Sequence, residues 1–184
     1  MHSRRSFLAM AGLIGLASCA QSKFRTYNGP PVTRVQVFKS TRRLYLQSGR
    51  ATLKEYPFEL GFAPRGHKVF EGDGRTPEGH YYIDRRNPNS SYHLSVGISY
   101  PDAKDRERAA ELELPPGGDI FIHGTPSMFK GRKDWTAGCI AVANDDIEEI
   151  YSMVGNGTPI TIWPDVTVDE APVDDIPERV VDLE

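Results

Sequence analysis

The feature that most constrains the fold is a series of short segments in which apolar and polar residues alternate, separated by turns rich in glycine and proline. From Val32 onward, Val35 and Val37 alternate with polar neighbours. A period of two places every second side chain on the same face of a β-strand, so that one face is buried. Comparable segments predict strands at 44–47, 51–62, 80–84, 92–99, 119–123, 139–142 and 158–163. A mainly β fold, a sandwich or barrel, is therefore expected.

Two segments depart from this pattern and predict short helices. Residues 102–112 predict a helix with a solvated face, formed by the charged side chains of Asp102, Lys104, Asp105, Arg106, Glu107 and Arg108. The second segment has apolar residues at helical spacing: Ile147, Ile150, Tyr151 and Val154. Asp145 is its expected N-cap, with Glu148 completing a capping box, and Gly155-Asn156-Gly157 is expected to end it.

Composition narrows the class of protein. The chain has 184 residues, of which 39% are hydrophobic and 26% charged, which suits one globular domain with its own core. A formal net charge of -3 gives no indication of nucleic-acid binding. Two cysteines are too few for a disulfide framework. The oligomeric state is not determined by these properties.

The first residues are typical of an export signal. Arg4 and Arg5 precede a short apolar stretch, which resembles a twin-arginine signal, with an ordinary secretory signal as the alternative. Leu16-Ala17-Ser18-Cys19 resembles a lipoprotein box, so residues 1–18 are expected to be removed and Cys19 to be lipidated. Residues 19–31 would then be a linker. The protein is expected to face the periplasm on a membrane, by resemblance the outer membrane of a Gram-negative cell.

The C-terminal segment 165–184 differs in composition from the rest of the chain. It holds eight acidic side chains and a single basic one, Arg179, together with Pro172 and Pro177. Few of its side chains are large and apolar, so the segment is predicted to be a disordered acidic tail. The predicted folded domain is 32–164.

Cys139 would be the single free thiol of the processed chain. In an exported protein such a residue is a buried structural side chain, half of an intermolecular disulfide, or a reactive group. It ends the small, turn-forming segment Thr136-Ala137-Gly138, and Gly138 allows a substrate to approach the backbone closely. We expect the amides of Gly138 and Cys139 to face an oxyanion.

A thiol with an ordinary pKa of about 8.5 needs a neighbouring base to become nucleophilic at neutral pH. His123 follows the apolar segment Ile120-Phe121-Ile122 and precedes Gly124, which places an imidazole at the end of a predicted strand beside a flexible loop. Imidazole is suited to accept this proton. Its orienting partner is expected to be a backbone carbonyl, Asp119 or Ser127.

Together these residues resemble the L,D-transpeptidase family with the YkuD-type catalytic domain. His123-Gly124 lies sixteen positions before Cys139, and Thr136, Gly138 and Cys139 match the family's Ser/Thr-His-Gly-Cys motif. The segment 74–83 resembles a second motif, Lys/Arg-Thr-Pro-x-Gly. Ala137 and Ala141 depart from the pattern, where the family usually has His and Arg.

The resemblance implies a YkuD-type β domain whose Cys139 forms a thioester with a peptidoglycan stem peptide, with His123 as general base. The acceptor is then an amine of a second stem or, alternatively, water, as in an amidase or L,D-carboxypeptidase. A third possibility is a wall-binding lipoprotein without activity. Tyr92, Trp135 and the basic group Lys130, Arg132 and Lys133 are candidate groove residues. No cofactor and no metal are predicted, because the spacings of His67, His80 and His93 match no ligand motif.

Overall fold

The computed structural model describes residues 22–164, and the predicted signal, Cys19 and the acidic tail lie outside these residues. Strands β1–β8 form one eight-stranded sheet in the order β3-β2-β1-β8-β4-β5-β6-β7. Their bounds are Arg34–Phe38, Arg43–Ser48, Ala51–Pro57, Gly79–Asn87, Ser95–Ile98, Phe121–His123, Ile140–Ala141 and Pro159–Trp163. The pairs β1–β8 and β6–β7 are parallel, and the others are antiparallel. The predicted mainly β fold is confirmed.

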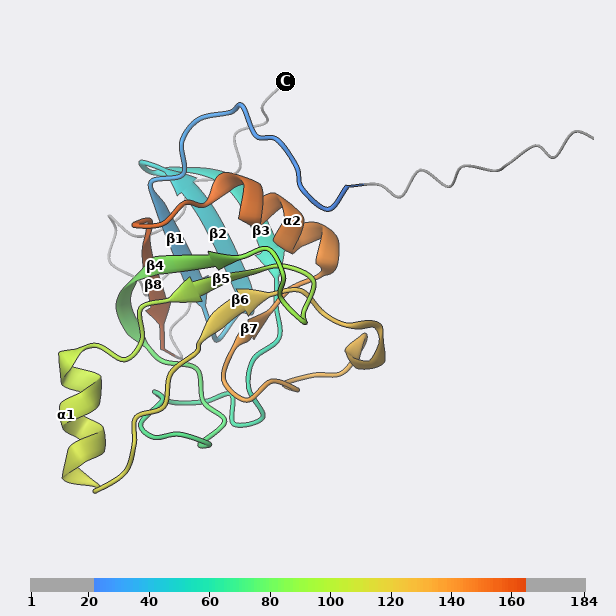
Figure 1. The fold of residues 1–184 in the computed structure, drawn as a ribbon. Coiled ribbons are helices and arrows are strands. Elements are labelled where there is room, and N and C mark those ends of the chain that lie inside the picture. The colour runs from blue at the N-terminus through green and yellow to red at the C-terminus, as the bar shows by residue number, and fades with distance from the viewer. Residues whose placement is uncertain (1–21, 165–184) are drawn as a thin grey trace, which may run out of the picture.

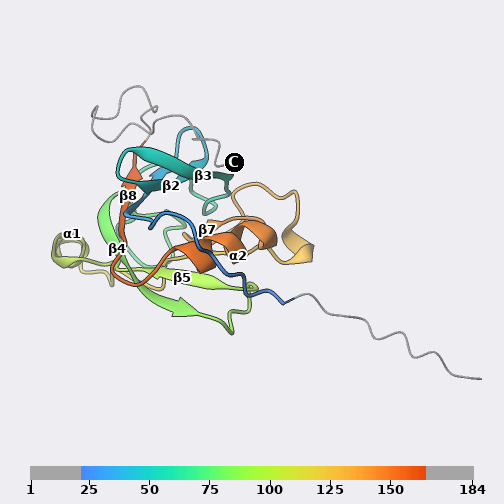
Figure 2. The ribbon, with the colours of Figure 1, turned by 90° about the horizontal axis from the view of Figure 1, so that it is seen from above.

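The sheet curls into a half-barrel around helix α2 (Asn144–Met153) (Figure 2). Alternate side chains of the strands point inward, as in Val35 and Val37 of β1, which are fully buried. Ile147 and Ile150 of α2 are buried in the same core. Helix α1 (Ala103–Glu111) lies on the outside, beyond the ends of β4 and β5 (Figure 1). The core therefore lies between the concave face of the sheet and α2.

The helix ends differ from the prediction in two ways. Helix α2 begins two residues earlier than expected, its N-cap is Ala143 rather than Asp145, and no side chain caps it. In α1, Asp102 is the N-cap and forms a capping box with Asp105. Asp105 is buried, not solvated as predicted, because its carboxylate accepts a hydrogen bond from Tyr81 and pairs with His67. Neither α1 nor α2 is long and apolar enough to cross a bilayer, and the described chain contains no other helix that is.

The described part of the expected linker, residues 22–31, packs against the domain (Figure 1). Lys23 Nζ donates to the carbonyl oxygens of Pro88 and His93, at 2.7 and 3.0 Å. Arg25 donates to the carboxylates of Glu148 and Glu149 on α2, at 3.0 and 3.1 Å. This segment is thus an arm docked on α2 and the β4–β5 connection.

Strand β3 is shorter than predicted. It ends at Pro57, and the chain that follows contacts the loop of the predicted nucleophile instead of continuing the strand. Glu59 and Ala141 exchange backbone hydrogen bonds at 2.8 and 2.9 Å. Phe62 N donates to Thr136 O, and Thr136 N donates to Leu60 O. The segment 58–62 therefore lies along β7 and the loop that precedes it, where it supports the predicted nucleophile.

Candidate active site

The register of β6 and β7 determines how Cys139 and His123 are related. Ile122 pairs with Ile140 and His123 with Ala141. Paired residues of parallel strands share a face, and the buried Ile122 and Ile140 point into the core. His123 and Cys139 therefore share the opposite face. They are offset by two residues along the strands and one strand across, which gives a separation of about 8 Å between Cα atoms.

The Cys139 thiol opens on a cleft of about 710 Å³, which we call the thiol cleft. Ala137 and residues 115–120 line it, with Lys68, Glu71 and Gly72. The Sγ atom lies 3.5 Å from the carbonyl oxygen of Asp119, to which the thiol donates. Within residues 22–164 Cys139 is the only cysteine, and it is free and partly accessible. The thiol can therefore meet a ligand that enters this cleft.

Burial raises the pKa of the Cys139 thiol above its ordinary value. A backbone hydrogen bond from Phe121 opposes this rise, the Asp119 carboxylate adds to it, and the positive charges of Lys68 and Arg85 lower it. The net rise means that the resting cysteine is a protonated thiol.

The His123 side chain is 3% exposed and neutral at rest. Burial lowers the pKa of its imidazole, against a smaller opposing effect of the Gly124 carbonyl. Its Nδ1 lies 2.7 Å from that carbonyl oxygen. Because a carbonyl only accepts hydrogen bonds, Nδ1 carries the proton and Nε2 keeps its lone pair. Of the three orienting partners considered from the sequence, the structure has the backbone carbonyl.

In this structure, Cys139 and His123 form a neutral pair without a direct hydrogen bond, because Sγ donates to Asp119 O and Nδ1 to Gly124 O. A preformed thiolate is not the resting state, because burial raises the pKa of the Cys139 thiol. The arrangement suits a base that takes the thiol proton as the nucleophile attacks, once the thiol turns from Asp119 towards Nε2.

Two threonines fix the loop that carries the thiol. Thr76, which is fully buried, donates from Oγ1 to the Gly138 carbonyl oxygen at 2.8 Å. Thr136 Oγ1 donates to the Cys139 carbonyl oxygen at 2.7 Å and accepts from Gly138 N at 3.2 Å. The Thr-Pro segment found in the sequence therefore holds the residue before the predicted nucleophile by one side-chain hydrogen bond, and Thr136 holds the backbone of Cys139 itself.

Close backbone contacts explain the glycines of this loop. Gly138 has φ +132°, and a Cβ there would lie 2.6 Å from the carbonyl oxygen of Arg75. At Gly61 a Cβ would lie 2.0 Å from the carbonyl oxygen of Gly74. Real Cβ atoms do not approach backbone oxygen this closely, so both positions require glycine.

Of the two amides predicted to face an oxyanion, that of Gly138 is engaged in this state, and so is the amide of Gly124, which follows His123. Gly138 N donates to Thr136 Oγ1, and Gly124 N donates to the carbonyl oxygens of Tyr92 and Leu94. An oxyanion role for the Gly138 amide would require its bond to Thr136 to be exchanged for one to substrate. For Gly124 the structure instead shows a structural role, because a Cβ there would lie 2.5 Å from Asn144 Oδ1.

Sequence reasoning missed a buried ion pair at the wall of the thiol cleft. Lys68 and Asp73, with side chains 3% and 4% exposed, lie 2.9 Å apart. Asp73 also accepts backbone hydrogen bonds from Val69, Phe70 and Arg75. Lys68 and Asp73 lie in an irregular loop, where their spacing follows no helix or strand period. The sequence therefore gave no indication that the two side chains are buried together.

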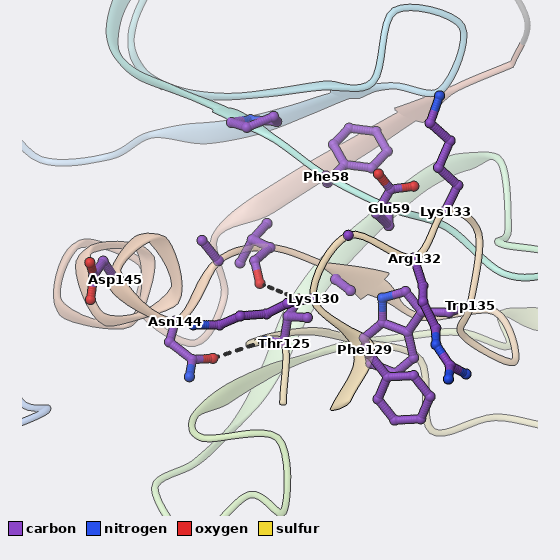
Figure 3. A pocket seen from close by; sticks show the side chains of 15 residues that line it. Phe58, Glu59, Thr125, Phe129, Lys130, Arg132, Lys133, Trp135, Asn144 and Asp145 are labelled. Carbon is purple, nitrogen blue, oxygen red and sulfur yellow. Dashed lines mark hydrogen bonds between the residues drawn. The ribbon is translucent and has the colours of Figure 1, made fainter. Parts of the chain in front are cut away.

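Tyr92 and Trp135 lie beside His123, and neither lines the thiol cleft. The Tyr92 ring stacks on the imidazole at 4.4 Å, and Trp135 contacts it edge-on at 5.6 Å. Phe129 stacks on Trp135 at 4.1 Å. Trp135 and Phe129 line a second opening of about 580 Å³, the aromatic groove, which also includes Lys130, Arg132 and Lys133 (Figure 3). In the described part of the chain, no group of three or more His, Cys, Asp or Glu is placed to hold a metal ion.

Comparison with known proteins agrees with this arrangement. Residues 32–162 match the YkuD family, described as the L,D-transpeptidase catalytic domain. The chain belongs to this L,D-transpeptidase family. The match covers β1 to β8 and includes both Cys139 and His123.

Among curated relatives, YafK of Escherichia coli strain K12, which has a provisional L,D-transpeptidase designation, is 31% identical over 157 residues. This alignment covers 80% of the chain and 58% of YafK, so the chain spans little more than half of that relative. YkuD of Bacillus licheniformis, with the same provisional designation, is 28% identical and is matched over 71% of the chain and 66% of its own length.

Solved structures share the fold. The helical cell shape determining protein Pgp2 of Campylobacter jejuni is 25% identical, with a TM-score of 0.61, over 77% of this chain and 50% of Pgp2. Bd1075 of Bdellovibrio bacteriovorus is 26% identical, with a TM-score of 0.54, over 74% and 49% of the two chains. The YkuD-type architecture predicted from the motifs is confirmed.

Proposed function

We propose that this protein is a cysteine-dependent L,D-transpeptidase that acts on peptidoglycan stem peptides, with Cys139 as nucleophile and His123 as general base. The observation that carries the proposal is that β6 and β7 of a YkuD-type domain present a cleft-facing thiol and an oriented neutral imidazole on one face. Nδ1 of the imidazole is held by Gly124, so Nε2 is the basic atom.

In the first half-reaction, His123 Nε2 takes the thiol proton while Sγ attacks the carbonyl carbon of the third residue of the donor stem. The carbon–nitrogen bond to the leaving residue breaks, and the imidazolium returns the proton to the departing amine. The product is a thioester on Cys139. In the second half-reaction, the acceptor amine loses a proton to Nε2 and attacks the thioester. The carbon–sulfur bond then breaks, and the imidazolium returns this proton to the sulfur, which restores the thiol and the neutral imidazole.

Hydrolysis is the second candidate, and one observation favours it. Ala137 is exposed and lines the thiol cleft, where the family motif usually has a histidine. The smaller side chain leaves space for water beside the thioester. Incubation with purified stem peptides separates the two reactions, because transfer yields joined products and hydrolysis yields shortened ones.

Export and lipid anchoring complete the proposal. We infer that a twin-arginine-like signal is removed before Cys19, that this residue carries the lipid, and that the domain faces the periplasm from the outer membrane. The motifs of residues 1–19 support this, and metabolic labelling with a fatty acid analogue tests it. Loss of the label in Cys19→Ala is expected, and equal labelling of both proteins would contradict the anchor.

Acylation of Cys139 by a carbapenem-type reagent, followed by mass spectrometry, tests the chemistry. The wild type is expected to gain one adduct, and Cys139→Ala none. His123→Gln should slow acylation by at least about a hundredfold, whereas His80→Gln, which alters an exposed imidazole bonded to Thr161, should not. An unlabelled folded wild type would refute the proposal, and stem-peptide binding without turnover would support a wall-binding role.

A further inference from the structure

The turn at residues 92–94 contacts the predicted base, His123, in two ways. The ring of Tyr92 stacks on the imidazole, with 4.4 Å between the ring centroids and 30° between the planes. The backbone carbonyl of Tyr92 also accepts a hydrogen bond from Gly124 N at 3.0 Å, and the carbonyl oxygen of Gly124 is the group that holds Nδ1 of His123. The position of this turn therefore affects one face of the imidazole and the backbone that orients it.

The backbone of this turn is strained. His93, its central residue, has φ +75°, in the left-handed region that residues other than glycine rarely adopt. Leu94 N donates to Tyr92 O at 3.0 Å, which closes a three-residue γ-turn of the rare hand. A backbone in such a conformation persists only where the surrounding structure holds it. The contacts made by His93 are therefore needed to keep the turn in place.

Two contacts from distant parts of the chain hold His93. Its Nε2 lies 2.8 Å from Glu148 Oε1 on α2, and its carbonyl oxygen accepts a hydrogen bond from Lys23 Nζ at 3.0 Å. The other carboxylate oxygen of Glu148 accepts from Arg25 Nε at 3.0 Å, and Arg25 also pairs with Glu149 at 3.1 Å. Lys23 thus reaches the turn directly, and Arg25 reaches it through Glu148.

The environment of Glu148 favours this connection. Burial alone would raise the pKa of the Glu148 carboxyl, but hydrogen bonds from His93 and Arg25 lower it overall. The carboxylate is therefore charged at neutral pH, and its side chain is only 14% exposed. Figure 2 shows the arm running beside α2, where the ring of Phe24 lies 6.2 Å from that of Tyr151. The arm is thus docked by both charged and apolar contacts.

We propose that Lys23 and Arg25 are positioning residues for His123. The arm holds the strained turn 92–94, and the turn keeps the imidazole in the orientation in which Nε2 accepts the thiol proton. This inference rests on the proposed function, because it takes His123 to be the general base. It makes docking of the arm, which follows the predicted lipidation site in the chain, a condition for full activity.

The position of the imidazole is measured by nuclear magnetic resonance, without turnover. An aromatic ring stacked on an imidazole shifts the resonance of its Hε1 proton, and Tyr92→Leu gives the resonance without this shift. In the arm variant Lys23→Met/Arg25→Met, the His123 Hε1 resonance should move at least halfway from the wild-type value to the Tyr92→Leu value.

A matched variant controls for the loss of two positive charges. Arg65→Met/Lys104→Met removes two exposed cations that lie outside the arm. It should leave the His123 resonance and the acylation rate at their wild-type values. A second variant, Lys23→Arg/Arg25→Lys, keeps both cations in the arm and should retain most of the wild-type rate.

Acylation of Cys139 by a carbapenem-type reagent separates binding from chemistry. Lys23 and Arg25 are not among the described residues that line the thiol cleft, so the half-saturating reagent concentration should not change in the arm variant. Each exposed charged contact contributes about two- to fivefold to an equilibrium. Loss of both contacts should therefore lower the saturated acylation rate about tenfold.

Three kinds of result would overturn the assignment when the wild type is acylated. An arm variant with the wild-type rate, or with an unmoved His123 resonance, would show that the arm does not act through the imidazole. An equal loss in the charge control would show a general effect of charge. A higher half-saturating concentration at an unchanged saturated rate would place the effect in the thiol cleft. If wild-type Cys139 is not acylated, the proposed function fails, and the His123 resonance alone decides whether the arm positions the imidazole.

Discussion

Replacing Thr76 with valine removes one hydroxyl from beneath the nucleophile loop and changes the side-chain shape little. Thr76 is fully buried, and its Oγ1 donates to the carbonyl oxygen of Gly138, the residue before Cys139. Valine has nearly the volume of threonine, so the substitution opens no cavity of consequence. The change therefore isolates one hydrogen bond and the backbone position that it controls.

The expected loss in free energy of unfolding follows from burial. In Thr76→Val the Gly138 carbonyl loses its donor in a site that excludes water, which costs about 1–3 kcal/mol. That is a substantial part of the roughly 5–15 kcal/mol that stabilises a domain. The carbonyl is also free to rotate away, which misplaces the adjacent thiol. A displacement of about 1 Å lowers rates by as much as about a hundredfold.

Two measurements and a matched variant test this reasoning. Urea unfolding gives the change in stability, and carbapenem acylation followed by mass spectrometry gives the rate at Cys139. Thr76→Ser keeps the hydroxyl and should retain most of the acylation rate, although it loses a buried methyl group. If Thr76→Val and the wild type are equally stable and equally fast, or if serine fails to rescue the rate, the positioning role of Thr76 is refuted.

Further predictions concern charge. Because the pKa of the Cys139 thiol is raised, its alkylation rate should reach half-maximum at a higher pH than that of free cysteine, and Asp119→Asn should lower this midpoint. Lys68→Met leaves the Asp73 carboxylate buried without its cation, which should cost about 3 kcal/mol in urea unfolding. Arg25→Ala should cost less than about 1 kcal/mol and increase amide hydrogen exchange across the arm 22–28.

The pH dependence of the Lys68–Asp73 pair has a defined sign. Burial alone would raise the pKa of Asp73, but hydrogen bonds from backbone amides and Lys68 lower it overall. Its contribution to stability is therefore present above the unfolded pKa of about 3.9 and is lost as the pH falls through the lower folded value. Lys68→Met should reduce this acid-dependent loss, and an unchanged acid profile would contradict the argument.

Controls separate these effects from general damage. Glu107→Gln removes an exposed carboxylate on α1 and should leave the alkylation midpoint unchanged, so an equal shift in both variants would contradict the specific effect of Asp119. Combining Lys68→Met with Asp73→Asn should recover part of the lost stability. Protected amides throughout the arm of Arg25→Ala would show that other contacts hold this segment.

The local sequence was sufficient to predict those features that depend only on a residue's neighbours in the chain, namely the strands, the helices and the motif residues. The period-two segments located all eight strands, and the helical spacing of Ile147 and Ile150 located α2. The His-Gly and Gly-Cys pairs led to the correct family and to the two residues that the sheet places on one face. These periods can be read from the sequence because successive side chains of a strand point to opposite faces of the sheet, whatever packs against those faces.

Contacts between distant segments were decided by the tertiary structure alone. Nothing local indicates that Thr76 bonds to Gly138, that Lys68 and Asp73 are buried together, or that Arg25 docks on α2. The protonation states of Cys139 and His123 were also decided by the tertiary structure. Burial is the largest influence on both pKa values, and it arises only when the whole sheet curls around α2. Sequence thus specified which residues carry the chemistry, whereas the packing of remote segments set their desolvation and hydrogen-bond partners.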